Sequence, residues 1–251
     1  MAEHSGGKAA ASVAIANDDA TLDAMHADSE LRELRSKLLA AYAKYRYTYN
    51  FTWYGRPIIQ LPEDIVAIQE IILRTRPDLV IETGVAHGGS VVLSASMLEL
   101  LGSGEVLGID VDIRQHNREA LEAHPLRKRI RLIQGSSIDD RVVRQVRERA
   151  VDAKRVMVML DSNHAHEHVA RELELYSPLV KRDCYLVVFD TVVEDLPVGL
   201  FPDRPWGKGN NPKTAVWEFL KSTDRFEIDR RLESRLFTTV APDGYLRCIK
   251  D

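Results

Sequence analysis

The stretch LVIETGVAHGGSVV, residues 79–92, decides the fold. It begins as an apolar β run that ends at Glu82-Thr83, turns at Gly84, and continues as a helix from about Gly89-Ser90. In open α/β sheets, ligands bind at the carboxyl ends of the strands, and glycines there let the backbone approach a ligand closely. The N–H groups at the start of the helix favour an anionic group, a carboxylate as well as a phosphate. The stretch therefore predicts a strand–turn–helix unit with a ligand site at its turn.

Segments typical of strands and of helices alternate beyond this unit. Strands separated by helices of roughly 10 to 15 residues are typical of a parallel sheet covered on both faces. The strands are nearly continuous apolar runs, which suits a sheet buried on both sides. We predict strands at 78–83, 105–112, 130–135, 155–161 and 184–192, with helices at 90–101, 117–124, 140–150 and 168–180. The fold class is therefore α/β, doubly wound, with a mostly parallel sheet.

The pattern changes after residue 193. A helix is predicted at 214–223, and the apolar runs at 226–233 and 237–249 predict an antiparallel hairpin with its turn at Pro242-Asp243-Gly244. Residues 194–213 are irregular and rich in proline and glycine. Long loops of this kind often serve as lids, although an ordered surface loop is the other interpretation. As a lid, this loop would place Phe201 and Trp206 over a substrate.

The residues before the sheet divide into two parts. Residues 1–27 have little apolar periodicity and predict a flexible tail. Residues 28–75 form a helical and aromatic extension, followed by the ligand-binding domain at 76–251 with its lid loop at 194–213. Trp53 and Tyr54 in the extension either line the substrate pocket or plug the core. The apolar stripe of the first helix consists of Leu31, Leu34, Leu38 and Leu39, and a second helix is predicted to start at Pro62.

Composition narrows the class of protein. The 251 residues carry a formal net charge of -4, so we expect no nucleic-acid partner, because such binders usually have a basic face. No run of about 18 apolar residues occurs, and we expect neither a membrane span nor a secretory signal. Two cysteines, Cys184 and Cys248, make no disulfide framework and are expected to be buried. We predict a cytoplasmic protein.

The glycine loop favours an adenosyl ligand over a dinucleotide. The NAD fingerprint G-x-G-x-x-G is absent, because Ala86 stands where its middle glycine would admit a pyrophosphate. Asp110, 26 positions after Gly84, ends the second predicted strand, where an acidic side chain accepts hydrogen bonds from ribose hydroxyls. A tight turn with a solvated aspartate is the alternative. Ser136 and Ser137 follow the third strand, where they would border an adenine; Ser136, Ser137 or Asp139 would also serve as the cap of the next helix, and the two roles are compatible.

Taken together, these motifs resemble a known family. The stretches IETGVAHGGS, GIDVD, LDSNHAHEH and NNPKTAV, with NFTWYGRPIIQLPEDI before the sheet, are similar to those of the cephalosporin hydroxylase-like and rhamnosyl O-methyltransferase family. The resemblance covers about Leu31 to Ile249. It implies a class I methyltransferase fold that uses S-adenosylmethionine. More distantly, the order of motifs is similar to catechol O-methyltransferase and macrolide sugar O-methyltransferases, which use a divalent metal, usually Mg²⁺.

The resemblance also implies roles for single residues. The methionine part of S-adenosylmethionine would lie against Glu82, Gly84 and Ser90, the ribose against Asp110, and the adenine beside Ser136 and Ser137. The metal ligands would be Asp161 and Asp190, with His164 as the general base. Metal-using relatives often carry an acidic pair where this chain has Phe189-Asp190, so one carboxylate is missing and the need for Mg²⁺ stays open.

The chemistry of these side chains agrees with the resemblance. Asp161 and Asp190 each close an apolar run, at the edge of the sheet where ligands bind. Methyl transfer to an oxygen needs an aligned hydroxyl and the removal of its proton. A bound cation lowers the pKa of a coordinated hydroxyl, and a histidine such as His164 accepts a proton near neutral pH. Alternatively, His164 simply starts a helix, or pairs with His168 at a zinc site; for the latter the H-E-x-x-H pattern is missing. We expect His166 and His168 to be solvated helix residues.

We therefore predict an O-methyltransferase that acts on a hydroxyl of a small molecule, a deoxysugar or a natural-product intermediate. Because the first predicted helix offers a surface to a neighbouring copy, we also expect a homo-oligomer. Two alternatives are an oxidoreductase or hydroxylase, and a non-catalytic accessory protein that binds S-adenosylmethionine.

Overall fold

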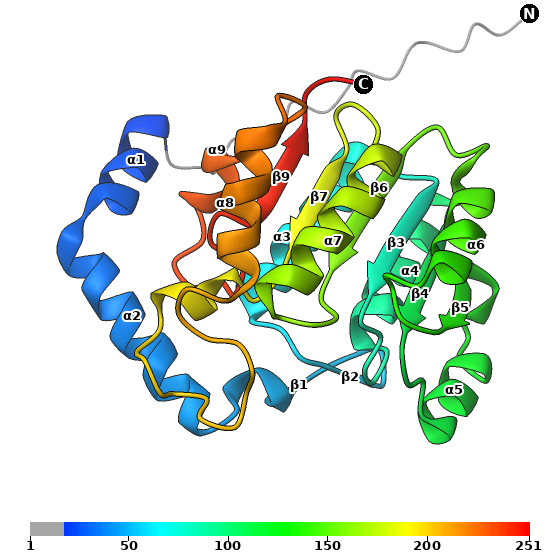
Figure 1. The fold of residues 1–251 in the computed structure, drawn as a ribbon, viewed down its shortest axis with the longest axis horizontal. Helices are drawn as coiled ribbons and strands as arrows, with labels where there is room; N and C mark the ends of the chain where they lie inside the picture. Colours follow the sequence, from blue (N-terminus) through cyan, green and yellow to red (C-terminus); the bar gives the residue numbers. More distant parts are fainter. Residues whose placement is uncertain (1–17) are drawn as a thin grey trace, which may run out of the picture.

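The computed structural model describes residues 18–251, and a seven-stranded sheet forms their centre (Figure 1). The spatial order of the strands is β5-β4-β3-β6-β7-β9-β8. The strands are β3 (Leu79–Thr83), β4 (Glu105–Asp110), β5 (Ile130–Gln134), β6 (Val156–Leu160), β7 (Tyr185–Val188), β8 (Phe226–Ile228) and β9 (Tyr245–Cys248). The first five of these are parallel to one another, and only β9 runs antiparallel to its neighbours. This topology confirms the predicted doubly wound α/β fold.

Helices cover both faces of the sheet, and each face has its own apolar core. On one face α3 (Pro62–Thr75), α4 (Gly89–Leu101) and α5 (Gln115–Glu122) pack; on the other lie α6 (Asp140–Ala150), α7 (His166–Tyr176) and α8 (Pro212–Ser222). Every residue of β3, β6 and β7 is buried. The strands therefore alternate their side chains between two cores, which explains their continuous apolar sequences. Short 3₁₀ turns join the elements at η2 (Arg127–Arg129), η3 (Ser177–Leu179) and η4 (Thr191–Asp195).

The predicted C-terminal hairpin has the correct antiparallel pairing of strands, but the predicted turn at residues 242–244 does not connect those strands directly. β8 and β9 are antiparallel neighbours, but residues 229–244 between them hold the short helix α9 (Arg230–Glu233) and an irregular run. The predicted strand residues 237–241 bond to α3 instead. The carboxylate of Glu63 accepts from the Thr238 N–H at 2.9 Å, and the buried carboxylate of Asp64 accepts from the Val240 N–H at 2.9 Å. Because α3 takes these backbone donors, the run cannot pair with β8.

The N-terminal extension lies beside the sheet and is weakly packed. Residues 19–27 of the predicted flexible tail instead form the helix α1 (Asp19–Ala27). Asp18 caps this helix, and its Leu22 is buried. Residues 1–17 of that predicted tail lie outside the described residues. α2 (Ser29–Lys44) has the predicted helical form but not a single buried residue. Figure 1 shows α1 and α2 in blue along one side of the molecule.

A small hairpin joins the extension to the sheet domain. After η1 (Tyr47–Asn50), β1 (Phe51–Trp53) pairs with β2 (Arg56–Ile58) across a turn at Tyr54 and Gly55. Both turn residues have positive φ, 44° and 83°, as a tight hairpin turn requires. The hairpin holds the start of α4 in place, because a Cβ at Gly89 would lie 2.2 Å from the carbonyl oxygen of Pro57.

Two further predictions concern burial and membranes. Cys184 and Cys248 are both free and fully buried, as expected. Among residues 18–251, no helix has the length and apolar character needed to cross a bilayer.

Candidate active site

The turn after β3 is fixed by close backbone contacts. Gly84 has φ +91°, and a Cβ built there would lie 2.1 Å from the carbonyl oxygen of Asp161. The end of β3 therefore touches the end of β6 directly. At the start of α4, Gly88 adopts a left-handed conformation with φ 84°, which no larger side chain favours.

Asp110 lies at the end of β4, beside the predicted glycine turn. Its Oδ2 accepts from the backbone N–H groups of Val85 at 2.8 Å and Ala86 at 3.0 Å. Its Oδ1 accepts from the N–H of Asp112 at 3.0 Å. The carboxylate is half-buried and ties the second strand to the loop.

Glu82 is a buried carboxyl at the centre of the same strand end. It is 1% exposed, and burial raises its pKa to about 8 despite a hydrogen bond from Ser90. Its Oε2 atom has no hydrogen-bond partner among the described residues. A buried acid with an unused oxygen is suited to a cationic or hydrogen-bonding ligand group.

Ser136 and Ser137 follow β5, and Ser137 belongs to a polar network with α7. The Oγ atoms of Ser137 and Ser162 both lie 3.2 Å from Nε2 of His168, and Ser162 also donates to Glu172 at 2.7 Å. Glu172 is fully buried. The cap of α6 that Ser136 and Ser137 were candidates for is supplied by Asp139.

The histidines of α7 depart from the prediction. His166 and His168 were expected to be solvated helix residues, but each is mostly buried and bonded. His166 Nδ1 lies 2.8 Å from the Thr214 hydroxyl of α8. The zinc alternative also fails, because His164 precedes α7 and joins Asp161 and Asp190, whereas His168 faces Ser137.

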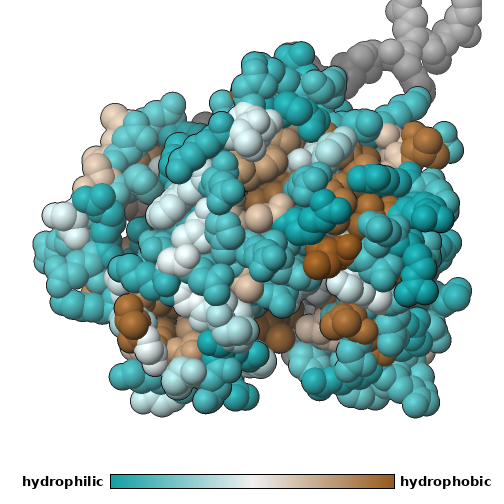
Figure 2. Space-filling view, in the orientation of Figure 1, coloured by the Kyte–Doolittle hydropathy of each residue, from teal (hydrophilic) through white to brown (hydrophobic). Residues whose placement is uncertain are grey.

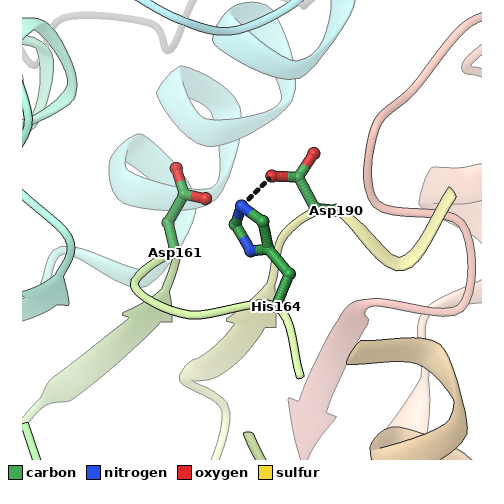
Figure 3. A group of neighbouring side chains, drawn as sticks. All are labelled: Asp161, His164 and Asp190. Atoms are coloured by element: carbon green, nitrogen blue, oxygen red, sulfur yellow. Dashed lines mark ion pairs between the residues drawn. The ribbon is translucent and has the colours of Figure 1, made fainter. Parts of the chain in front are cut away.

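Asp161, His164 and Asp190 form one cluster at the ends of β6 and β7. Each offers a ligand atom, and these atoms all lie within 4.8 Å of one another. Nε2 of His164 lies 3.1 Å from Oδ2 of Asp190, and Figure 3 shows the two aspartates on either side of the imidazole. Asp190 has φ 55°, a left-handed conformation that turns its side chain out of the strand toward the cluster. The structure therefore brings together the three residues to which the sequence analysis assigned metal binding and proton transfer.

The electrostatics of the cluster fit a cation. Burial raises the pKa of Asp161 well above its ordinary value, and the nearby carboxylates of Asp190, Glu82 and Glu172 raise it further. A divalent cation would relieve this repulsion, and Mg²⁺ prefers carboxylate oxygens with several waters. Phe189, in place of a second acid, is 2% exposed and packs in the core, so it offers nothing to a metal. The donor set of two carboxylates and one imidazole therefore fits a metal ion.

A cavity of about 580 Å³ opens beside this cluster. His164 and Asp190 form part of its lining, and so do Phe201 and Trp206 of the predicted lid loop. The Trp206 ring meets the His164 ring edge-on, with centroids 5.1 Å apart. Figure 2 shows the lower edge of the molecule hollowed between the part holding α2 and this loop and the part holding α5.

The far wall of the cavity comes from residues that the sequence interpretation missed. They are the aromatic and cationic side chains of α2 and η1: Tyr42, Lys44, Arg46, Tyr47 and Tyr49. The run YAKYRYTYN carries the signal, an aromatic residue at nearly every second position just before the sheet domain. Of the two alternatives for Trp53 and Tyr54, the structure does not support a place in the lining of this cavity. Trp53 donates to Ser96 of α4, and Tyr54 is 60% exposed at its turn.

The loop over the cavity is closed at its base. The Glu194 carboxylate accepts from the Gly209 N–H at 2.8 Å and from the Asn211 side chain at 2.5 Å. Asn211 is fully buried and caps α8. The segment between these residues is therefore a closed loop whose tip carries Phe201 and Trp206.

The sheet order and the acidic strand ends beside a glycine turn define the class I methyltransferases, and comparisons with known proteins give the family. The family described as Rhamnosyl O-methyltransferase/CmcI matches residues 45–249, and the chain belongs to it. The rhamnosyl O-methyltransferase of Mycobacterium tuberculosis is 29% identical over 187 residues, 73% of this chain and 72% of the relative. That of Mycobacterium leprae is 29% identical over 197 residues, 78% and 82% of the two chains.

Solved structures share the fold at low identity. A structure of CmcI with Mg and SAM is 19% identical with a TM-score of 0.57, and the match covers 80% of this chain and 77% of that one. An O-methyltransferase from Bacillus cereus in complex with SAH is 15% identical with a TM-score of 0.53, over 95% and 94% of the chains. The predicted family, fold and class of enzyme, an S-adenosylmethionine-dependent O-methyltransferase, are thereby confirmed.

Proposed function

We propose that this enzyme transfers a methyl group from S-adenosylmethionine to a hydroxyl of a small, sugar-like acceptor in the 580 Å³ cavity. The observation that carries the proposal is the Asp161–His164–Asp190 cluster. It borders the cavity on one side and touches the glycine turn at Gly84 on the other. A donor at the turn and an acceptor in the cavity would therefore meet at these three side chains.

The cofactor would lie along the carboxyl ends of β3, β4 and β5. The unused oxygen of Glu82 is suited to the ammonium group of the methionine part, with Ser90 and Gly84 beside it. Asp110 would hold the ribose, and Ser136 and Ser137 would border the adenine. In support of this, Asp110 already binds the loop backbone, which preorganises the site.

In the proposed reaction the acceptor oxygen attacks the methyl carbon of the sulfonium. The new O–CH₃ bond forms as the S–CH₃ bond breaks, and the sulfur keeps the electron pair as S-adenosylhomocysteine. The hydroxyl proton passes to the imidazole of His164, and the Asp190 carboxylate, whose Oδ2 lies 3.1 Å from Nε2, would stabilise the resulting imidazolium. Trp206 packs on the His164 ring and would keep water from the transferring methyl group.

Asp161 and Asp190 are the residues that would hold Mg²⁺. When bound, the ion would lower the pKa of an acceptor hydroxyl. The aromatic lining supports a sugar-like acceptor, because flat rings pack well on the apolar faces of sugars. The names of the relatives, rhamnosyl O-methyltransferases, favour a deoxysugar.

Methyl transfer to a panel of rhamnosides, followed as S-adenosylhomocysteine release, tests the proposal. We expect His164→Ala to lower kcat by roughly 10²–10⁴-fold, the usual range for a lost general base. Asp161→Asn should lower it comparably, and chelation should abolish activity that added Mg²⁺ restores. S-adenosylhomocysteine binding should persist in His164→Ala.

His116→Ala is the matched control, because His116 is exposed on α5 and should be fully active. Full activity of both His164→Ala and Asp161→Asn would refute the assigned roles. Cofactor binding without turnover on any acceptor would favour the non-catalytic alternative.

A further inference from the structure

A second cavity, of about 330 Å³, lies between the N-terminal helices and the catalytic body. α1 and α2 form one side of it, and η4, α8 and α9 contribute to the other. It shares the side chains of Leu39, Val192 and Leu196 with the acceptor cavity. The two cavities are therefore neighbours on opposite sides of one apolar partition.

The lining of this second cavity is charged, in contrast to the aromatic acceptor cavity. Two arginines face it from one helix, because Arg32 and Arg35 are one turn apart on α2. Neither makes an ion pair with any residue from 18 to 251 at 4.0 Å or less. The remaining charged lining residues come from the body: Asp195, Lys213, Arg230, Glu233 and Asp243, with His26 from α1.

The carboxylates of the body are already used by the cations of the body. Lys213 is 6% exposed and its Nζ lies 2.6 Å from Asp195 and 3.6 Å from Asp243. Arg230 contacts Asp243 as well and lies 3.0 Å from Glu233. Together with Arg32 and Arg35, four cationic side chains face three carboxylates, so the cavity lining carries a net charge of +1, or +2 when Glu233 is protonated.

Two titratable groups in the wall, His26 and Glu233, have pKa values that differ from their ordinary values. The pKa of His26 is lowered by burial and then by Arg35, Arg230 and Arg32, so three arginines act on one point. Glu233 is 5% exposed, and its Oε1 has no hydrogen-bond partner among the described residues. Burial raises the pKa of Glu233 to about 7, so near neutral pH a large fraction carries a proton that an anion can accept.

We infer that this cavity binds a small oxyanion group, phosphate or carboxylate, between the two arginines of α2 and the body. Charge-assisted hydrogen bonds from arginine are the strongest that a protein offers to such a group. The anion would also fix α2, which has no buried residue of its own and whose other residues line the acceptor cavity. The group is either a free anion or the anionic end of an acceptor that reaches past Leu39.

Calorimetric titration of the full chain with inorganic phosphate tests the site without cofactor or acceptor. We expect saturable binding at one site, weakened at least about tenfold in Arg32→Gln/Arg35→Gln, a loss of roughly 1.4 kcal/mol. Lys37→Gln/Arg171→Gln removes the same charge from exposed positions and should bind like the wild type. Arg35→Lys, which keeps the charge, should retain most of the binding.

Titration with a deoxyhexose 1-phosphate distinguishes a free anion from the anionic end of an acceptor. This second experiment rests on the proposed function. If the anion belongs to the acceptor, this probe binds more tightly than phosphate, and Phe201→Ala weakens it alone. If the anion is free, both probes bind alike and neither responds to Phe201→Ala. Absence of saturable binding, or equal binding by the two double variants, would overturn the inference and leave the methyl-transfer proposal untouched.

Discussion

The two halves of the active site are built by different means. The half proposed to bind the cofactor, the turn after β3 with the ends of β4 and β5, is held by contacts with the backbone, such as those of Gly84 and of Asp110. The half proposed to bind the acceptor consists of α2, which has no buried residue, of η1, and of the loop 195–211, which a few side-chain bonds close at its base. Steric fit therefore fixes the cofactor half, whereas the acceptor half can change its residues without disturbing the sheet.

Gly84→Ala is the sharpest test of this difference and has the largest expected effect. The new Cβ would lie 2.1 Å from the Asp161 carbonyl oxygen, at a φ of +91° that alanine avoids. We expect a loss of about 3 kcal/mol or more of folding stability, because two backbones must separate. Cofactor binding should disappear with it. Thermal unfolding and calorimetry with S-adenosylhomocysteine measure both effects.

Gly207→Ala is the control from the acceptor half, since no atom lies within 4 Å of its added Cβ. It should change stability by less than about 0.5 kcal/mol. Equal stability of the two variants would remove the basis of the comparison.

Glu82→Gln tests whether a buried acid lowers the folding stability of the protein while raising its affinity for the cofactor. Burial raises the pKa of Glu82 from 4.5 to about 8, so its contribution to stability is full below pH 4.5 and is lost as the pH rises to about 8. Glutamine cannot ionise. The variant should therefore gain stability over the wild type between pH 5 and 8, on the order of a few kcal/mol.

The same variant should bind S-adenosylmethionine at least about tenfold more weakly, because the ammonium group loses its charged partner. Unfolding at pH 5, 7 and 9 checks the first effect, and calorimetry checks the second. Glu227→Gln, an exposed pair partner of Arg247, should show neither. A stability difference that does not depend on pH would contradict the buried-acid interpretation.

The same division explains what the sequence could predict. The parallel sheet, its glycine turn and the polar residues at its strand ends follow from apolar runs that end in polar residues, because parallel strands bring their carboxyl ends together. The far wall of the acceptor cavity comes from α2, which is about 150 positions before the loop in the sequence. No local sequence pattern predicts that the tyrosines near the end of α2 face that loop. The C-terminal run 237–241 was misread for a similar reason: its partner, Asp64, lies about 175 positions away.

In the acceptor half, Trp206→Ala should change catalysis and leave the fold intact. The ring lies 5.1 Å from His164 and 5.2 Å from Phe201, centroid to centroid. Its removal should raise the acceptor KM about tenfold, because an aromatic contact contributes roughly 1 kcal/mol beyond its buried area. The affinity for S-adenosylhomocysteine should not change, and Trp206→Phe should recover most of the loss. A fall in the affinity for S-adenosylhomocysteine would contradict this prediction and would mean that the loop contributes to cofactor binding.

The smallest effects are expected on α2, where two leucines of one predicted stripe have different surroundings. Leu34 is 54% exposed, whereas Leu39 lines both cavities. Leu39→Ser should raise the acceptor KM several-fold, and Leu34→Ser should stay within about 0.5 kcal/mol of wild-type stability with unchanged kinetics. Denaturant unfolding and steady-state kinetics at two protein concentrations measure both. A loss of more than about 1 kcal/mol in Leu34→Ser, dependent on protein concentration, would mean that a second copy covers this face of α2, as the predicted homo-oligomer requires.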